Sequence, residues 1–253
     1  MDVYSADLDL VLARAADAGV RAIITIGIDA ASSKQAVRLA ERFTQLYAVV
    51  GIHPHDAANA TEEDFKIVTE LAAHEKVVGY GEIGLDYAKN YSPQTIQQQV
   101  FSRQLQLAKK LNLPVIIHDR EAHEDTLCLL QEHAPYPAGG IMHCFSGDMA
   151  LAEKIMDLGF FISIPGIVTF KNAHSLHGVA ANLPLDSMLI ETDGPFLTPV
   201  PYRGKRNEPG YLIHTAQKIA DLAGVALQEL AAATTANAKS IFQLNAINSA
   251  NGL

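Results

Sequence analysis

The sequence predicts an α/β fold, a TIM-like (β/α) barrel, from three observations. Short runs rich in β-branched residues alternate with amphipathic segments along most of the chain, and such alternation indicates parallel βαβ units. The length of 253 residues and the hydrophobic fraction of 49% suit a single barrel, which typically has about 250 residues. Residue types that bind metals stand at the ends of several strand-like runs.

The chain opens with a helix rather than a strand. Ser5 is suited to cap this helix, apolar residues recur at helical spacing from Leu8 to Ala15, and Gly19 ends it. Seven strand-like runs follow, at 21–27, 46–52, 77–83, 114–118, 140–144, 160–164 and 187–191. A closed barrel of this type has eight strand-helix units, so the first strand is predicted to be missing.

A helix is expected after each run. The first of these helices lies near 33–43, and the second follows a capping box at 61–64. The third begins with Ser92 as its cap and Pro93 in first position, the fourth runs through 126–130, and the fifth extends from a cap at Ser146 to Gly159. The last three lie near 172–181 and at 211–223 and 227–244. In the helix after Ser92, the residues expected to be buried include Ile96, Val100, Leu107 and Leu111. The last nine residues are expected to fray.

Composition limits the classes of function. We expect one domain over 1–253, because no repeat, low-complexity stretch or change of composition divides the chain. The net charge of −9 counts against broad binding of duplex DNA, although a small nucleic-acid substrate can still be held locally. No apolar run approaches the ~20 residues of a membrane span, and the start lacks the features of a signal peptide. The two cysteines indicate no disulfide framework, which fits the cytoplasm.

Four strand-like runs lead into residues that bind metals: Glu82, His118, His143 and Asp193. The carboxyl ends of barrel strands meet at one mouth, so we expect these side chains to converge there on a divalent metal. A carboxylate buried at a strand end is costly unless it is paired or holds a metal. Each residue alone has a plainer explanation, as a hydrogen-bonded histidine or as a turn at Asp193. Four such residues, each at the end of a strand-like run, favour a metal site over these separate explanations.

Metal-assisted hydrolysis needs oxygen and nitrogen ligands, an open position for water, and a base. Glu82 is placed to bridge two ions, and Asp193 is suited to bind one ion and to accept the proton of its water. We therefore expect Glu82 and Asp193 to be catalytic and up to two divalent ions to bind. Oxygen and imidazole ligands suit Mg²⁺, Mn²⁺ and Zn²⁺ alike, so the sequence leaves the metal open.

Two further residues are expected to bind substrate. His53 follows a strand-like run, and we favour a role in orienting phosphate or water over a structural one. Arg206 belongs with Arg203 and Lys205 to a basic loop after the last strand-like run. An arginine there offers a bidentate fork to a phosphate. The alternative for this loop, above all for Lys205, is a solvated basic surface.

With these segments in place, the sequence resembles the TatD-type metal-dependent deoxyribonucleases of the amidohydrolase-like barrel group. The motifs that carry the resemblance occur in the order of the family: Gly51–His55, Gly81–Asp86, Ile117–Arg120, His143–Gly147, Glu191–Pro195 and Arg203–Pro209. The resemblance implies a TIM-like barrel, a divalent-metal centre and hydrolysis of DNA phosphodiester bonds. It also implies that Glu82, His118, His143 and Asp193 are metal ligands, since they match the metal-binding positions of the family.

The sequence departs from the family at its start. The family opens with a strand that ends in a His-x-His pair, and this sequence has neither. We expect that the natural chain begins upstream of Met1 and carries the pair. The alternative is a natural variant with an impaired metal centre.

We therefore predict a cytoplasmic, metal-dependent deoxyribonuclease that acts on single-stranded DNA or DNA ends, with exonuclease action. One alternative is a different hydrolase on the same barrel, acting on an ester, amide or lactone, including an aminoacyl ester on RNA. Another is a non-catalytic protein that binds metal or nucleic acid. The sequence does not indicate the polarity of cleavage or the oligomeric state.

Overall fold

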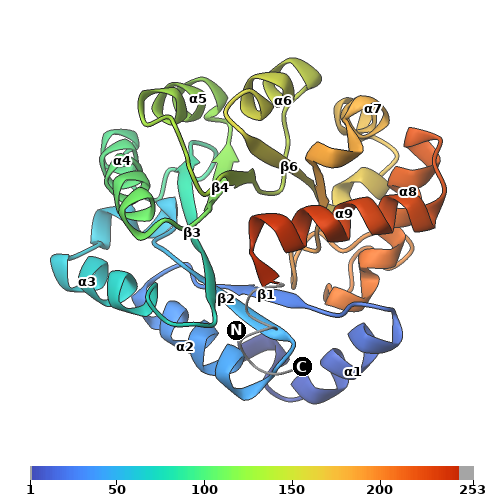
Figure 1. The fold of residues 1–253 in the computed structure, drawn as a ribbon, viewed down its shortest axis with the longest axis horizontal. Coiled ribbons are helices and arrows are strands. Elements are labelled where there is room, and N and C mark those ends of the chain that lie inside the picture. Colours follow the sequence, from blue (N-terminus) through green and yellow to red (C-terminus); the bar gives the residue numbers. More distant parts are fainter. Residues whose placement is uncertain (1, 245–253) are drawn as a thin grey trace. The chain divides into compact units, whose positions relative to one another are not determined.

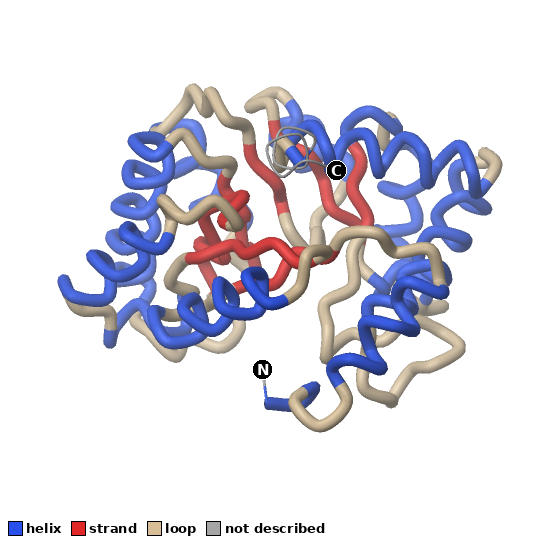
Figure 2. Tube along the Cα trace, turned by 60° about the horizontal axis from the view of Figure 1, so that its bottom comes forward, coloured by secondary structure: helices blue, strands red, loops and turns tan. Residues whose placement is uncertain are grey.

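The computed structural model describes residues 2–244, in which strands and helices alternate (Figures 1 and 2). The strands are β1 Ile23–Ile26, β2 Leu46–Val50, β3 Val77–Asp86, β4 Val115–Arg120, β5 Gly140–Met142, β6 Phe160–Ile164 and β7 Met188–Ile190. The α-helices are α1 Leu8–Asp17, α2 Ala30–Arg42, α3 Glu62–Leu71, α4 Gln94–Leu111, α5 His123–Glu132, α6 Met149–Met156, α7 His174–Asn182, α8 Leu212–Ala223 and α9 Leu227–Ile241. Short 3-10 helices are η1 Asp2–Tyr4, η2 Pro54–Asn59, η3 Gly166–Thr169, η4 Leu185–Ser187 and η5 Pro209–Tyr211.

The described residues form two compact units, and the larger one contains Ile24–His143 and Lys154–Phe161. Its strands lie side by side in the order β1-β2-β3-β4-β5, and the pairs β2–β3, β3–β4 and β4–β5 are parallel. Helix α2 packs on β2, α4 on β3 and α5 on β4, so helices cover one face of these strands (Figure 1). Fully buried side chains of this unit include Tyr80, Ile83, Leu85, Phe101 and Ile117.

The smaller unit contains residues 2–23, 144–153 and 162–237. Its strands β6 and β7 are parallel, with Ile162 beside Met188 and Ile164 beside Ile190. Helix α8 packs against α7 and η3, and α1 packs against η5. The fold class is thus α/β with parallel strands, as predicted, and seven strands lie within residues 2–244. The single domain over 1–253 stays a prediction, and the expected fraying of residues 245–253 concerns residues outside the described part.

Strand β3 is longer than the sequence indicated. The sequence predicted a strand-like run at 77–83, but the strand continues to Asp86. All its residues are buried except Glu82, which is partly exposed. The pairing with β4 shifts in register between Tyr80 and Ile83, and from there Gly84 pairs with His118 and Asp86 with Arg120. Because side chains alternate along a strand, Glu82, Gly84 and Asp86 share a side.

Helix α4 buries a different face from the one predicted. Ile96, Val100, Leu107 and Leu111 are only partly buried, whereas Gln97 and Gln104 are almost fully buried. The amide of Gln104 bonds both backbone groups of Ile52: its Oε1 accepts from the N–H at 2.9 Å and its Nε2 donates to the carbonyl at 2.8 Å. These bonds satisfy backbone groups in the segment that leads from β2 to His53.

Gln97 does the same for the end of β3. Its Oε1 accepts from the backbone N–H of Asp86 at 2.8 Å, and its Nε2 donates to the carbonyls of Asp86 and Ser92. Ser92 was expected to cap α4, but Pro93 stands at the cap position. The Ser92 hydroxyl instead donates to the carbonyl of His55 and accepts from the N–H of Ala58. Both buried glutamines of α4 therefore hold loops that follow strands.

Helix starts were predicted with mixed success. The capping box at α3 is confirmed, because the Thr61 hydroxyl accepts from the N–H of Asp64. The expected caps at Ser5 and Ser146 are wrong: Asp7 precedes α1, and Asp148 accepts from the N–H of Leu151 in α6.

Among residues 2–244, no helix has both the length and the apolar character needed to cross a membrane.

Replacing Gln104 by leucine should lower the free energy of unfolding by about 2 kcal/mol or more. The change leaves the buried N–H and carbonyl of Ile52 without partners, at about 1–3 kcal/mol each. Urea unfolding followed by circular dichroism measures the loss. Gln106→Leu, at an exposed position of the same helix, is the matched control and should change stability by about 0.5 kcal/mol or less. Equal midpoints for the two variants would contradict the assigned role.

Candidate metal centre

Four side chains of the larger unit lie in the carboxyl-terminal halves of four neighbouring strands or just beyond them. Glu82 lies in β3, His118 lies in β4, and His143 directly follows β5, where its N–H donates to the carbonyl of Ile117. His53 follows β2, and its N–H donates to the carbonyl of Ile28 beyond β1. Because β2, β3, β4 and β5 pair in parallel, each with the next, these strand ends lie at the same edge of the sheet.

One oxygen of Glu82 is surrounded by three imidazole nitrogens. Oε1 lies 2.7 Å from Nδ1 of His118, 3.7 Å from Nε2 of His143 and 3.8 Å from Nε2 of His53. The rings of His53 and His118 meet edge to face, with centroids 4.4 Å apart. The structure therefore brings together three of the four predicted ligands, Glu82, His118 and His143, and adds His53.

The charges of this cluster compensate one another. Burial alone would raise the pKa of Glu82, but the nearby His143, His118 and His53 hold it far below its ordinary value. Burial would lower the pKa of His118, yet its hydrogen bonds to Asp86 and Glu82 outweigh that cost and raise the pKa to about 9. In the protein without metal, the Glu82 carboxylate is thus an anion paired with a cationic His118.

His53 is held in one neutral form. Its burial lowers the pKa to about 3, so the ring carries a single proton at neutral pH. Nδ1 accepts a hydrogen bond from the backbone N–H of His55 at 3.2 Å, which requires that this nitrogen be unprotonated. The proton is therefore on Nε2, the nitrogen that faces Glu82. In this form His53 is a hydrogen-bond donor toward the cluster, while His118 and His143 are better suited to bind a metal.

The donor set fits a divalent cation. Nitrogen and carboxylate oxygen ligands bound to one zinc ion at about 2.0–2.2 Å lie about 3–4 Å from each other. Oε1 of Glu82 lies 2.7 Å from Nδ1 of His118 and 3.7 Å from Nε2 of His143, close to this spacing. Imidazole and carboxylate ligands match the borderline metals, including Zn²⁺ and Mn²⁺.

Two residues missed by the sequence analysis complete the cluster. His55, to which the sequence analysis gave no role of its own, places Nε2 at 2.7 Å from Oδ2 of Asp86. The same oxygen lies 3.3 Å from Nε2 of His118. Burial would raise the pKa of Asp86, but the bonds from His118, the Lys89 N–H and His55 keep it well below its usual range. The signal was present in the sequence, because Asp86 stands four residues after Glu82 and shares its side of an extended strand.

Asp193 belongs to the smaller unit and follows β7 there. Its carbonyl accepts from the N–H of Phe196 at 2.6 Å, in the turn that begins the loop to η5. Tyr4 is nearby: burial raises the pKa of its hydroxyl to about 12, and the charge of Asp193 adds to that shift. The roles of Asp193 as ligand and base stay predictions.

Arg206 differs from what we expected, because its guanidinium is bound by acidic groups. It donates to both oxygens of Asp7, at 2.8 and 2.6 Å, and to Glu208 at 2.9 Å. A further bond goes to the carbonyl of Val3. Arg14 donates to the same Glu208, so the network joins α1 to the loop before η5. These partners compete with a phosphate for Arg206.

The other two basic residues of this loop are exposed and lie over aromatic rings. The guanidinium carbon of Arg203 lies 4.4 Å from the ring centre of Phe170, and Nζ of Lys205 lies 5.3 Å from that of Tyr202. Within residues 2–244, no carboxylate pairs with either cation. Their charge is thus available to an anion.

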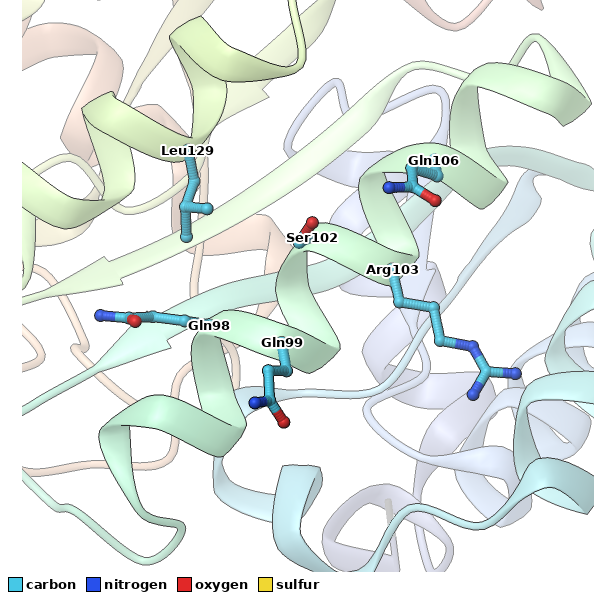
Figure 3. A pocket seen from close by; sticks show the side chains of 6 residues that line it. All are labelled: Gln98, Gln99, Ser102, Arg103, Gln106 and Leu129. Atoms are coloured by element: carbon cyan, nitrogen blue, oxygen red, sulfur yellow. The ribbon is translucent and has the colours of Figure 1, made fainter.

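A hollow of about 400 Å³ lies on the helices of the larger unit. Figure 3 shows its side chains, which come from α4 and α5: Gln98, Gln99, Ser102, Arg103, Gln106 and Leu129. It contains none of the predicted site residues, and its Arg103 is already paired with Glu62. The hollow therefore does not identify the site.

The family described as TatD related DNase matches residues 1–243. The chain belongs to the TatD family. This confirms the resemblance that the motifs indicated.

TatD relatives extend over nearly the whole chain. The metal-dependent hydrolase YabD of Bacillus subtilis is 47% identical over 96% of this chain and 95% of its own. The 3'-5' ssDNA/RNA exonuclease TatD of Salmonella typhimurium is 36% identical over 95% of each chain. The crystal structure of the TatD homolog YJJV from Escherichia coli superposes with a TM-score of 0.90 at 33% identity, over 95% of this chain and 93% of that one. The chain is thus a TatD-family metal-dependent hydrolase with a TIM-like barrel fold, and it uses a divalent metal.

Gly84 should be required for the cluster, because it lies beside His118 with a φ of +143°. A Cβ atom there would lie 1.9 Å from the carbonyl oxygen of His118, so β3 and β4 must separate in Gly84→Ala. We expect this variant to lose most of its metal affinity, measured by calorimetric titration with Zn²⁺, and to unfold at a lower temperature. Gly178→Ala, in α7 with open space around it, is the control and should keep both properties. Unchanged affinity in Gly84→Ala would show that the spacing of β3 and β4 does not matter.

Proposed function

We propose that this TatD-family hydrolase is a nuclease that removes nucleotides from single-stranded DNA or from DNA ends. One observation carries the proposal: three imidazole nitrogens face a single carboxylate oxygen of Glu82 at the ends of parallel strands. A relative at 36% identity is named a 3'-5' ssDNA/RNA exonuclease, which supports the same class of substrate. We also propose that the protein acts in the cytoplasm, which agrees with two cysteines that form no disulfide in the described part of the chain.

In this proposal, Glu82, His118 through Nδ1 and His143 through Nε2 would hold the metal, and the carboxylate of Glu82 would be shared if a second ion bound. When bound, a divalent metal supplies Lewis acidity toward the phosphate and lowers the pKa of water in its coordination shell. His53 donates from Nε2 to a phosphate oxygen, because its proton is held on that nitrogen by the bond to His55. Asp193 would serve as a further metal ligand, as the family resemblance implies, and its carboxylate is the group that would accept a proton from water.

The basic loop supplies the contact with the nucleic-acid backbone. We expected Arg206 in this role, and its bonds to Asp7 and Glu208 would compete with a phosphate for the guanidinium. We therefore propose that Arg203 and Lys205 bind phosphates. Both are exposed and lie over neutral rings, so their charge is not cancelled by a carboxylate among the described residues.

Hydrolysis of a single-stranded oligodeoxynucleotide, labelled at its 5' end, tests the activity. With Mg²⁺, Mn²⁺ or Zn²⁺ we expect a ladder of products shortened from the 3' end, and we expect a chelator to abolish it. Glu82→Gln should lower turnover by a factor of 100 or more, on the order of the loss when an electrostatic group of an active site is removed. A set of carboxyl esters and an aminoacyl-RNA ester are the comparison substrates.

Three outcomes would contradict the proposal in different ways. Faster turnover of a carboxyl or aminoacyl ester would assign the site to the other hydrolase chemistry. Activity that survives chelation would remove the metal from the reaction. Internal nicking of circular duplex DNA that outpaces release from ends would overturn the preference for ends.

Removing both Arg203 and Lys205 should weaken binding of single-stranded DNA through lost phosphate contacts. In Arg203→Ala/Lys205→Ala, the slope of log K against log salt concentration should become shallower by about 1.4, from about 0.7 for each contact on a single strand. Fluorescence anisotropy with labelled oligonucleotide measures this slope. Arg206→Met should instead lower the melting temperature, since it removes three hydrogen bonds to Asp7 and Glu208 and leaves these carboxylates with Arg14. If the slope becomes shallower by more in Arg206→Met than in the double variant, Arg206 is the residue that binds phosphate.

A further inference from the structure

We propose that Asp86 is a positioning residue that holds His118 with its proton on Nε2, so that Nδ1 is presented to the metal, and that His55 holds Asp86 in place. This inference rests on the proposed metal centre and deepens it. It assigns roles to two side chains that neither the ligand set nor the substrate contacts include.

Asp86 is placed to act on His118 from inside the protein. Its side chain is 1% exposed at the end of β3, on the same side of the strand as Glu82. Oδ2 lies 2.7 Å from Nε2 of His55 and 3.3 Å from Nε2 of His118. Oδ1 accepts from the backbone N–H of Lys89 at 2.8 Å. The carboxylate thus faces one backbone N–H and two ring nitrogens that can each carry a proton.

The chemistry of a carboxylate fixes the position of the protons. An ionised carboxylate only accepts hydrogen bonds, so the Nε2 atoms of His55 and His118 must both carry a proton to bond with it. In the metal-binding form, His118 has one ring proton, and this proton stays on Nε2. The lone pair is then on Nδ1, which lies 2.7 Å from Oε1 of Glu82. Carboxylate partners of this kind orient metal-binding histidines in many proteins.

Asp86 itself is held by two separate segments. Gln97 of α4 bonds its backbone N–H and carbonyl, at 2.8 and 3.1 Å. His55 bonds its side chain, and the carbonyl of His55 accepts from the hydroxyl of Ser92 at 2.9 Å. The direction of the carboxylate is thus fixed from the side of α4 and from the turn after β2. A side chain with only a structural role in the loop would not need a second bond to His118.

The chain offers a matched control in Asp119. This carboxylate is also nearly buried and also bonds a histidine, with Oδ2 at 2.6 Å from Nδ1 of His123. It stands next to His118 in β4, so its side chain points to the opposite side of the strand. Asp119→Asn therefore removes a comparable bond close to the cluster without touching a proposed ligand.

Two measurements on Zn²⁺ binding test the proposal. Calorimetric titration gives the zinc affinity, and nitrogen NMR of the zinc-loaded, ¹⁵N-histidine-labelled protein shows which ring nitrogen of His118 carries the proton. In the wild type we expect a proton on Nε2 and a zinc-shifted Nδ1. Asp86→Asn should weaken zinc binding by about 10- to 100-fold and lose the protected Nε2 proton. Asp119→Asn should change neither, even if both variants melt at a lower temperature.

The outcomes separate this inference from the proposed function. A wild type that binds no zinc contradicts the metal centre, and this inference with it. A wild type that binds zinc through Nε2 of His118, or an Asp86→Asn variant with unchanged affinity, contradicts only the role of Asp86.

Variants of His55 give a second test that does not alter Asp86. His55→Leu cannot donate to Oδ2, so it should weaken zinc binding in the same direction as Asp86→Asn but by less. His55→Gln has an amide N–H that can replace the lost donor, so it should restore most of the affinity. A wild-type zinc affinity in His55→Leu would show that His55 does not hold Asp86. If Asp86→Asn fails to fold, the zinc affinity of His55→Leu tests the role of Asp86 in its place.

Discussion

The buried carboxylate of Glu82 is the constraint on which this structure depends. Its side chain is only 13% exposed, and an anion in such a place is unstable unless charges or donors of opposite character surround it. Three imidazole rings, delivered by three other strand ends, meet that need. The same arrangement provides the ligand types of a divalent metal. Stabilising one buried charge and building a metal centre are thus the same structural task in this chain.

Close strand packing and side-chain hydrogen bonds fix the main chain that carries these rings. β3 and β4 approach closely because Gly84 has no side chain beside the carbonyl of His118. The segment before His53 and the end of β3 are both bonded by glutamines of α4. A metal centre needs its ligands fixed to within a fraction of an ångström, and regular strands with tied ends can provide that.

The sequence was most informative where hydrophobic pattern and strand order decide the structure. All seven strand-like runs became strands, and their parallel order made it possible to expect Glu82, His118 and His143 at one edge. It failed where polar side chains are buried. Gln97 and Gln104 have the residue type of a surface, so the apolar period pointed to Ile96 and Val100 as the buried face of α4.

Contacts between distant segments were the other limit. Nothing local in the basic loop indicates that Arg206 meets Asp7, nearly the whole chain away, so a phosphate role was the natural interpretation. The end of β3 was also placed too early, because glycines on both sides of Glu82 are typical of a loop. A predicted strand that continued to Asp86 would have put Asp86 on the same side as Glu82, because side chains alternate along a strand, and so beside the cluster.

The two glutamines of α4 have a consequence for transferring this site to other sequences. A chain could keep every histidine and carboxylate of the cluster and yet replace Gln97 and Gln104 with apolar residues. Its loops after β2 and β3 would then need other anchors, and the spacing of the rings would no longer follow from this template. Inheritance of the anchoring helix is therefore as informative for function assignment as inheritance of the ligands.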